Sequence, residues 1–306
     1  MSVEFRIPIA PTQSFFDQVE FFNFGLRRLG GCYESAPLRV FVGDKCDLDA
    51  VLAHNRWSER WPVNWHRVSD EISDRHGMYG TANSRFGRPD PVERIVVMAD
   101  ADTLLLRDID DIIARLTHQE AMIAGHVAHF PPEENGTILP DPRSPQYWPT
   151  LFGLFGLELP ENTFRYTMDA SGELPRTPAY FNLGFVALNR HAFDMIGREI
   201  HDTHRRLAKL TSSFMRCQIA LAVIVQAMGI KAVNLGAIYN AANDPSHLEI
   251  NDVSHDEIRV LHYLRQTHVD RSRIGDLAYI REISEKPQFP VNRTLLDALL
   301  AWHGTR

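Results

Sequence analysis

The sequence predicts an α/β fold with a central, mostly parallel sheet flanked by helices. Two observations support this prediction. Short apolar runs of strand length alternate along the 306 residues with longer segments whose apolar residues recur at helical spacing. The apolar runs contain few polar residues, which is typical of parallel strands that are buried on both faces.

The first third of the chain contains three such apolar runs. Pro11 ends the first run, and Ser14 is a good N-cap for the following helix, which Gly30 and Gly31 terminate. Residues 57–78 are rich in Trp, His and charge, so we expect them to be irregular. We expect strands over residues 6–10, 38–42 and 94–99, and helices over 14–29, 46–56 and 81–86.

The rest of the chain continues this alternation around one long interruption. Residues 130–178 are rich in Pro, Gly and aromatic residues and are expected to form an insertion, since long connections in compact domains are usually lids or binding loops. We predict one domain over residues 1–306, with a helical tail at about 270–306. Strands are expected over residues 121–127, 180–189, 231–235 and 259–264, and helices from residue 108 and over 191–210, 214–228 and 292–303.

Composition excludes several function classes. The formal net charge of -7 gives no sign of the basic face that nucleic-acid binding needs. The cysteines Cys32, Cys46 and Cys217 are scattered and predict free thiols in a reducing compartment. The N-terminus lacks a signal-peptide pattern, and no apolar stretch reaches transmembrane length. We therefore expect a cytoplasmic protein without a transmembrane segment.

The run over residues 94–99 ends on two carboxylates, Asp100 and Asp102, separated by the small residue Ala101. If the strand geometry persists, both carboxylates point the same way. Adjacent unpaired carboxylates repel each other and are costly to desolvate. A divalent cation that bridges to a phosphate relieves both problems, and Mg²⁺ or Mn²⁺ prefers such oxygen ligands. The carboxyl end of a buried strand is also where open α/β sheets bind ligands.

Two enzyme classes fit this pair of carboxylates. In haloacid-dehalogenase-like phosphatases a strand ends in a similar pattern and the first Asp is the nucleophile, a role that Asp100 would take. In nucleotide-sugar glycosyltransferases the pair chelates a metal–diphosphate. The phosphatase motif normally lies on the first strand and needs a downstream Lys, for which Lys209 and Lys231 are candidates, and a later strand that ends in paired acids. Here two strand–helix units come first and no such acidic strand end follows, so context favours the transferase.

Two motifs carry a resemblance to a known family. They are Met98-Ala-Asp-Ala-Asp-Thr-Leu-Leu-Leu-Arg-Asp-Ile-Asp110 and Tyr180-Phe-Asn-Leu-Gly-Phe-Val-Ala-Leu-Asn189. With the order of the other elements between residue 6 and about 265, the chain resembles glycosyltransferase family 8, the glycogenin-like and lipopolysaccharide-galactosyltransferase-like retaining enzymes. The resemblance implies a GT-A fold, a nucleotide-sugar donor that is usually UDP-linked, Mn²⁺ or Mg²⁺, and transfer of a hexose with retention to a glycan, lipid-linked or protein acceptor.

The resemblance also assigns roles to individual residues. Asp100 and Asp102 match the family's metal-binding pair, with Ala101 between them at the donor, and His262 matches the late His that completes the metal site. Asn182 and Gln218 match residues that reach the transferred sugar and are the catalytic candidates. The donor nucleotide would be held by Ala10, Thr12 and Gln13 at the end of the first strand and by Arg85. Outside the family pattern, Arg265 is a further candidate for contact with the diphosphate.

The chain departs from the family pattern at three places. Cys217 stands where an Asp would precede Gln218, and His126 and His129 follow the strand where another Asp is expected. The family's Gly and Lys-Pro-Trp after the late His are missing. A non-catalytic sugar-nucleotide or glycan-binding protein on a transferase scaffold therefore stays an alternative, beside the phosphatase. Within the insertion, Tyr147 and Trp148 are candidates for acceptor contacts.

Overall fold

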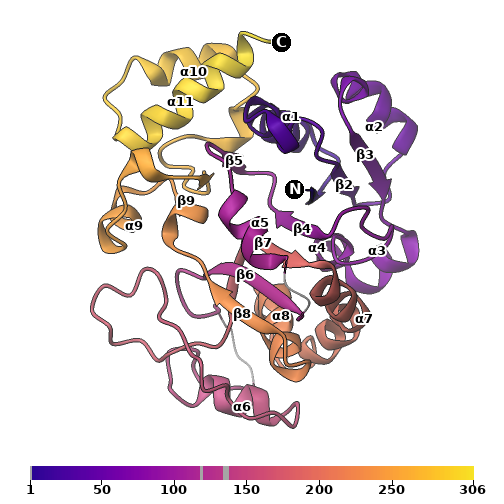
Figure 1. The fold of residues 1–306 in the computed structure, drawn as a ribbon, viewed down its shortest axis with the longest axis vertical. Helices are drawn as coiled ribbons and strands as arrows, with labels where there is room; N and C mark the ends of the chain where they lie inside the picture. Colours follow the sequence, from indigo (N-terminus) through magenta and orange to yellow (C-terminus); the bar gives the residue numbers. More distant parts are fainter. Residues whose placement is uncertain (1, 118–119, 134–137) are drawn as a thin grey trace.

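A seven-stranded sheet forms the centre of the computed structural model, which describes residues 2–117, 120–133 and 138–306 (Figure 1). Its strand order is β3-β2-β1-β4-β7-β6-β8. Strand β7 runs antiparallel to β4 and β6, and the other neighbouring strands are parallel. The strands are β1 (Val3–Ile9), β2 (Leu38–Val42), β3 (Val63–Arg67), β4 (Ile95–Ala99), β6 (Met122–Val127), β7 (Phe181–Asn189) and β8 (Lys231–Asn234). The predicted fold class is confirmed.

A smaller sheet lies beside one end of the central sheet. It contains β5 (Thr103–Leu105), β10 (Val260–His262) and β9 (Ala241–Ala242), in the order β5-β10-β9. β5 follows β4 after a short turn and pairs antiparallel with β10, so that Thr103 lies opposite His262. This pairing brings the late His next to the two carboxylates of the turn.

Helices cover both faces of the central sheet, and short 3₁₀ helices lie between the longer elements. The α-helices are α1 (Gln13–Arg28), α2 (Leu48–His54), α3 (Asp70–His76), α4 (Met78–Ser84), α5 (Asp110–Leu116), α6 (Tyr147–Gly153), α7 (Arg190–Leu207), α8 (Arg216–Ala227), α9 (Pro245–Ile250), α10 (Leu277–Ser284) and α11 (Pro290–His303). The 3₁₀ helices are η1 (Gly31–Tyr33), η2 (Arg56–Arg60), η3 (Ala237–Tyr239), η4 (His255–Glu257) and η5 (Arg271–Arg273).

The alternating side chains of β4 enter two different cores. Ile95 and Val97 pack with residues of α1, α2 and α5 on one face, whereas Val96 and Met98 pack with residues of α6, α7 and α8 on the other. All five residues of β4 are buried. This two-sided burial explains why the strand reads as a continuous apolar run rather than as an alternating one. A third core joins α1 to β10, α10 and α11.

Several boundaries differ from the sequence expectations. The segment 57–78 contains the edge strand β3 and the whole of α3, where we expected irregular structure. β3 has only one fully buried residue, Trp65, so it lacks the apolar signal of the inner strands. Helix α1 is capped by Thr12 rather than Ser14. The long insertion contains α6 and a single bridge between Phe164 and Thr177, and its residues 134–137 lie outside the described residues.

Tyr147 and Trp148 are not acceptor contacts. Both side chains are buried, and they pack in the core beneath α7 and α8. The Trp148 Nε1–H donates to the Tyr166 hydroxyl at 2.9 Å, which satisfies its one polar atom inside the core. The expectation was wrong because two adjacent aromatic residues in a loop-rich segment can anchor the insertion as readily as they can line a site.

Among the described residues, no helix is long and apolar enough to span a membrane. The organisation of residues 1–306 as one domain stays a prediction, as does the separate status of the helical tail.

Candidate active site

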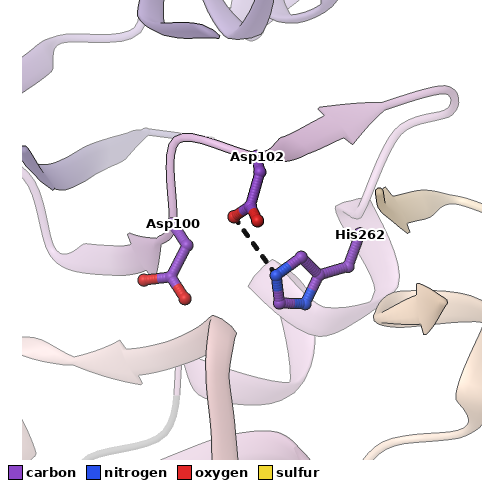
Figure 2. A group of neighbouring side chains, drawn as sticks. All are labelled: Asp100, Asp102 and His262. Atoms are coloured by element: carbon purple, nitrogen blue, oxygen red, sulfur yellow. Dashed lines mark ion pairs between the residues drawn. The ribbon is translucent and has the colours of Figure 1, made fainter. Parts of the chain in front are cut away.

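Two carboxylates and one imidazole meet at the carboxyl end of β4. Asp100 and Asp102 lie in the turn between β4 and β5, and His262 ends β10 (Figure 2). The three side chains can each offer one ligand atom, and these atoms all lie within 4.8 Å of one another. The His262 Nε2 lies 3.2 Å from the Asp102 Oδ1.

The backbone fixes this arrangement. The Asp100 N–H donates to the Gly184 carbonyl at 3.1 Å, which is the last bond between this segment and β7. The chain then turns, with the Thr103 hydroxyl donating to the Asp100 carbonyl at 2.7 Å. The Tyr263 N–H donates to the Asp102 carbonyl at 3.0 Å. The strand geometry ends at Ala99, so the condition for strand periodicity is not met at Asp102: the turn and the second sheet bring the carboxylates together.

Gly184 permits the close approach of His262 to β7. A Cβ at residue 184 would lie 2.3 Å from both the Cε1 and the Nδ1 of His262, which is far inside van der Waals contact. The Gly184 N–H donates to the Asn182 Oδ1 at 2.8 Å, so the same glycine also orients the amide of Asn182. A residue without a side chain is required here because two functional side chains converge on its Cα.

An arginine accompanies each carboxylate. The Arg85 Nη1 donates to the Asp100 Oδ1 at 3.0 Å and also to the carbonyls of Ala99 and Leu183. The Arg271 Nη1 donates to the Asp102 Oδ2. The Arg85 side chain is 2% exposed and that of Arg271 is 38% exposed, so the first arginine belongs to the interior and the second reaches the site from its surface.

The buried pair of Asp102 and His262 shifts both pKa values. Burial alone would raise the pKa of Asp102, but His262 and Arg271 outweigh it and hold that pKa below its ordinary value. Burial alone would lower the pKa of His262, but the Asp102 carboxylate outweighs it and raises the pKa. The His262 Nδ1 lies 3.0 Å from the Asn240 Oδ1, and an N–H there leaves the Nε2 to face Asp102.

A pocket of about 690 Å³ surrounds these groups. The carboxyl end of β1 forms one wall, and the start of β7 and of α8 forms another. The predicted site residues that line the pocket are Ala10, Arg85, Asp100, Ala101, Asp102, Asn182, Gln218, His262 and Arg265. The fold therefore places these predicted residues around one pocket, and their roles stay predictions.

Thr12 and Gln13 do not line the pocket. The Thr12 Oγ1 accepts from the Phe15 N–H at 3.4 Å as the N-cap of α1. The Gln13 Nε2 donates to the Asp17 Oδ1 at 3.2 Å, one turn further along the same helix. Their polar groups serve the start of the helix, and Phe15 takes their place in the pocket wall.

The amides of Asn182 and Gln218 face the pocket from β7 and α8. The Gln218 Nε2 contacts the Met215 Sδ at 3.4 Å, and its Oε1 is buried without a hydrogen-bond partner among the described residues. A buried amide oxygen without a partner is costly, which is consistent with an oxygen that a ligand satisfies. Burial raises the pKa of the neighbouring Cys217 thiol to about 12, so Cys217 is neutral and supplies no acid or base.

Three residues of the site carried no sequence signal that we used. Arg271 and Asn240 hold Asp102 and His262 respectively, and Asp44 lines the pocket in the turn after β2. Asp44 follows the end of a buried strand, which is the signal that identified Asp100. His129, noted as a departure from the family, lines the pocket, and burial holds its pKa well below the ordinary value, so its imidazole is neutral.

The donor set of Asp100, Asp102 and His262 fits a divalent cation. Cations such as Mg²⁺ hold ligands at about 2.1 Å in octahedral geometry, so neighbouring ligand atoms lie about 3 Å apart. The 3.2 Å between the His262 Nε2 and the Asp102 Oδ1 is close to that separation. Two carboxylates with one imidazole suit Mn²⁺, which accepts both oxygen and nitrogen ligands.

Comparisons with known proteins find similarity to glycosyltransferases. A family model described as Rhodobacterales glycosyltransferase domain matches residues 88–229, the segment that contains Asp100, Asp102, Asn182 and Gln218. No curated protein sequence matches the chain.

Solved glycosyltransferase structures share the fold. The apo structure of the bifunctional glycosyltransferase WbbM has a TM-score of 0.56 and 12% identity, over 94% of this chain and 50% of that chain. The chain thus spans about half the length of WbbM. Mouse xyloside xylosyltransferase 1, also in its apo form, has a TM-score of 0.50 and 11% identity, over 87% of this chain and 99% of that chain. The chain therefore has the GT-A fold of these glycosyltransferases, and residues 88–229 match a glycosyltransferase domain.

Proposed function

We propose that the protein transfers a hexose from a UDP-linked donor to an acceptor hydroxyl with retention of configuration, in a reaction that requires Mn²⁺. The observation that carries the proposal is the convergence of Asp100, Asp102 and His262 in one pocket with the amides of Asn182 and Gln218. The choice of UDP and of retention, and the narrower assignment to glycosyltransferase family 8, rest on the resemblance of the two motifs.

The pocket offers suitable groups for each part of the donor. Ala10 and Asp44 lie at the ends of β1 and β2, where the nucleoside would bind, and Arg265 lies near the cation ligands, where the diphosphate would bind. A divalent cation, when bound, would supply Lewis-acid stabilisation of the charge that develops on the leaving diphosphate. The Arg85 Nη1 donates to the Asp100 carboxylate and to two backbone carbonyls, so Arg85 fixes the position of that carboxylate.

The sugar end of the pocket contains amides rather than a carboxylate nucleophile. Asn182 and Gln218 would bind hydroxyls of the transferred hexose and orient its anomeric carbon. Cys217, in the place of the family's Asp, is neutral and cannot attack as an anion. These features favour attack of the acceptor hydroxyl from the face that the diphosphate leaves. We expect the acceptor to enter past Met78, Phe130 and Phe214, which line the pocket and are 70%, 47% and 55% exposed.

The test is binding and transfer with and without metal. Thermal-shift measurements with UDP, GDP, CDP and ADP, each with and without Mn²⁺, should show a large Mn²⁺-dependent rise in Tm for UDP. A ligand at 100 times its Kd stabilises the folded protein by about 2.7 kcal/mol. Asp100→Ala should abolish that rise and the Mn²⁺-dependent release of UDP from a UDP-hexose.

Asp108→Asn is the matched control, because Asp108 belongs to the same segment but is exposed and pairs with Arg259. It should leave the response to UDP and Mn²⁺ unchanged. Full activity of Asp100→Ala would show that the site is assigned wrongly. A response to none of the nucleotides would contradict the donor assignment.

The two alternatives make different predictions. A phosphatase needs a lysine at the phosphate, but neither Lys209 nor Lys231 lines the pocket, whose basic side chains are those of Arg85, Arg265 and Arg271. It would form a phospho-Asp100 that beryllofluoride traps. A non-catalytic binding protein would show the UDP response without any turnover of a UDP-hexose.

A further inference from the structure

Arg271 occupies a position that the proposed cation site needs. Its Nη1 donates to the Asp102 Oδ2, while the other carboxylate oxygen, Oδ1, faces the His262 Nε2. The Asp102 side chain is only 8% exposed, so its charge is compensated mainly by these two neighbours. In the free protein, Arg271 therefore provides the positive charge that a cation would provide.

Once a cation binds, the two carboxylates no longer need both arginines to neutralise their charge. Asp100 and Asp102 carry two negative charges, and Arg85 and Arg271 each neutralise one of them. A divalent cation neutralises both carboxylates by itself, which leaves two guanidinium charges beside a doubly charged ion. Like charges this close repel each other, so the more mobile arginine should move away.

Only one of the two arginines is free to move. Arg85 is 2% exposed, and its Nη1 has three acceptors on different elements. Arg271 is 38% exposed, and among the described residues the acceptor for its guanidinium is Asp102 alone. The guanidinium of Arg271 is therefore easier to move than that of Arg85, because it leaves a single acceptor and water can reach it.

The backbone of Arg271 stays anchored while its side chain moves. Its carbonyl accepts from the Gln18 Nε2 of α1 at 3.4 Å. Asp270 caps the turn of η5 by accepting from the Ser272 N–H at 2.9 Å. The long side chain projects from this fixed turn into the pocket that Arg265 also lines. A planar guanidinium binds two phosphate oxygens well, and a diphosphate is the anion that a cation at this site would bring.

We propose that Arg271 exchanges Asp102 for the diphosphate of the donor when a divalent cation binds to Asp100, Asp102 and His262. This inference rests on the proposed function and assigns the diphosphate contact to a residue that lies outside both motifs. Arg271 holds the carboxylate in place in the free enzyme and binds the nucleoside diphosphate in the loaded enzyme. The cation and Arg271 compete for Asp102, whereas the cation and the diphosphate each strengthen the binding of the other.

This exchange predicts opposite effects of a single substitution. In Arg271→Ala the competitor for Asp102 is gone, so the Kd for Mn²⁺ in nucleotide-free protein should fall about tenfold, as expected when one charge-assisted bond no longer has to be broken. The Kd for UDP at saturating Mn²⁺ should rise about 10- to 100-fold, because hydrogen bonds to the diphosphate are lost. Binding of uridine, which has no phosphate, should not change.

Arg273→Ala is the matched control. Arg273 lies in the same turn, pairs with Asp276 and does not line the pocket, so its removal deletes the same charge without touching Asp102. Arg271→Lys should give intermediate values for both ligands, since it keeps the charge but loses the planar pair of donors. Free Mn²⁺ is measured by electron paramagnetic resonance, and UDP and uridine by titration calorimetry.

The outcomes separate the two proposals. If the wild-type protein binds neither Mn²⁺ nor UDP, the proposed function fails. If it binds both, but Arg271→Ala weakens Mn²⁺ binding or leaves both Kd values unchanged, the exchange is wrong while the function stands. If Arg273→Ala shifts the two Kd values as Arg271→Ala does, the effect is general electrostatics and the exchange is also wrong.

Discussion

Two regions of the pocket hold their carboxylates in different ways. On the side of the central sheet, Arg85 is buried and joins Asp100 to the ends of β4 and β7 through three hydrogen bonds. On the side of the C-terminal segment, Arg271 reaches Asp102 from a short turn and is more than one-third exposed. Both arginines form ion pairs, but Arg85 is buried beside the central sheet, whereas Arg271 lies at the edge of the pocket.

The difference shows how a fold can combine a fixed and an adjustable half of one site. The fixed half comes from strands whose backbone bonds leave little freedom. The adjustable half comes from a C-terminal segment that pairs with β5 through β10 and packs against α1. A donor that carries its own cation can therefore reorganise the second half without disturbing the first.

The largest expected effect tests the fixed half. Arg85→Met removes a buried charge and leaves Asp100 and two carbonyls without their donor, so unfolding should become easier by about 3 kcal/mol. Arg271→Met should lower the free energy of unfolding by less than Arg85→Met does, because the buried Asp102 carboxylate keeps His262 as a partner. Urea unfolding of both variants in EDTA measures the difference. Equal losses would remove the distinction between the two regions.

A smaller effect on stability is expected when the ring of His262 is displaced from β7. Gly184→Ala places a Cβ 2.3 Å from the ring of His262, so the ring or the strand must shift. Overpacking of this kind costs about 1–3 kcal/mol, and the displaced imidazole should weaken Mn²⁺ binding strongly. Gly153→Ala is the control, because a Cβ at residue 153 meets no atom within 4 Å. Unchanged Mn²⁺ affinity in Gly184→Ala would argue against His262 as a ligand.

The sequence predicted the fixed region well and the adjustable region poorly. β2 and β6 were found with errors of at most one residue, because a strand that is buried on both faces is a continuous apolar run between turn residues. Asp100 was found because it ends such a run. Residues at the edge of the sheet gave weaker signals: β3 was missed, since of its five residues only Trp65 is buried.

Residues that act through long-range contacts were outside the reach of sequence patterns. Arg271 meets Asp102 across 169 positions of the chain, and nothing in its own neighbourhood distinguishes it from Arg273. Thr12 and Gln13 present the opposite case, since the family resemblance assigned them to the donor and the fold places them outside the pocket wall. Local hydrogen bonds at the start of α1 use both side chains first. Short-range capping competes with ligand binding at such positions, and a sequence alone does not show which prevails.

The smallest expected effect tests the proton that shares the adjustable region with Arg271. The pKa of His262 is raised because the Asp102 carboxylate outweighs the effect of burial. A raised pKa in the folded state contributes stability that is complete below the ordinary His value of about 6.5 and is lost as the pH rises through the folded value. In EDTA, the free energy of unfolding should therefore decline from about pH 7.5 to about pH 9. Burial lowers the pKa of His126 and His204 to about 4, so these two residues add stability with rising pH only while the unfolded chain still binds protons, below about pH 7.5.

His262→Gln should remove this decline, and urea unfolding at several pH values compares the two proteins. Binding of Mn²⁺ needs a neutral imidazole, so the Mn²⁺ affinity of the wild-type protein should rise over the same pH range. The two trends have opposite signs because the proton and the cation compete for one pair of side chains, as Arg271 and the cation compete for Asp102. If His262→Gln keeps the same slope as the wild-type protein, the buried pair is not the group that titrates, and the adjustable region consists of Arg271 alone.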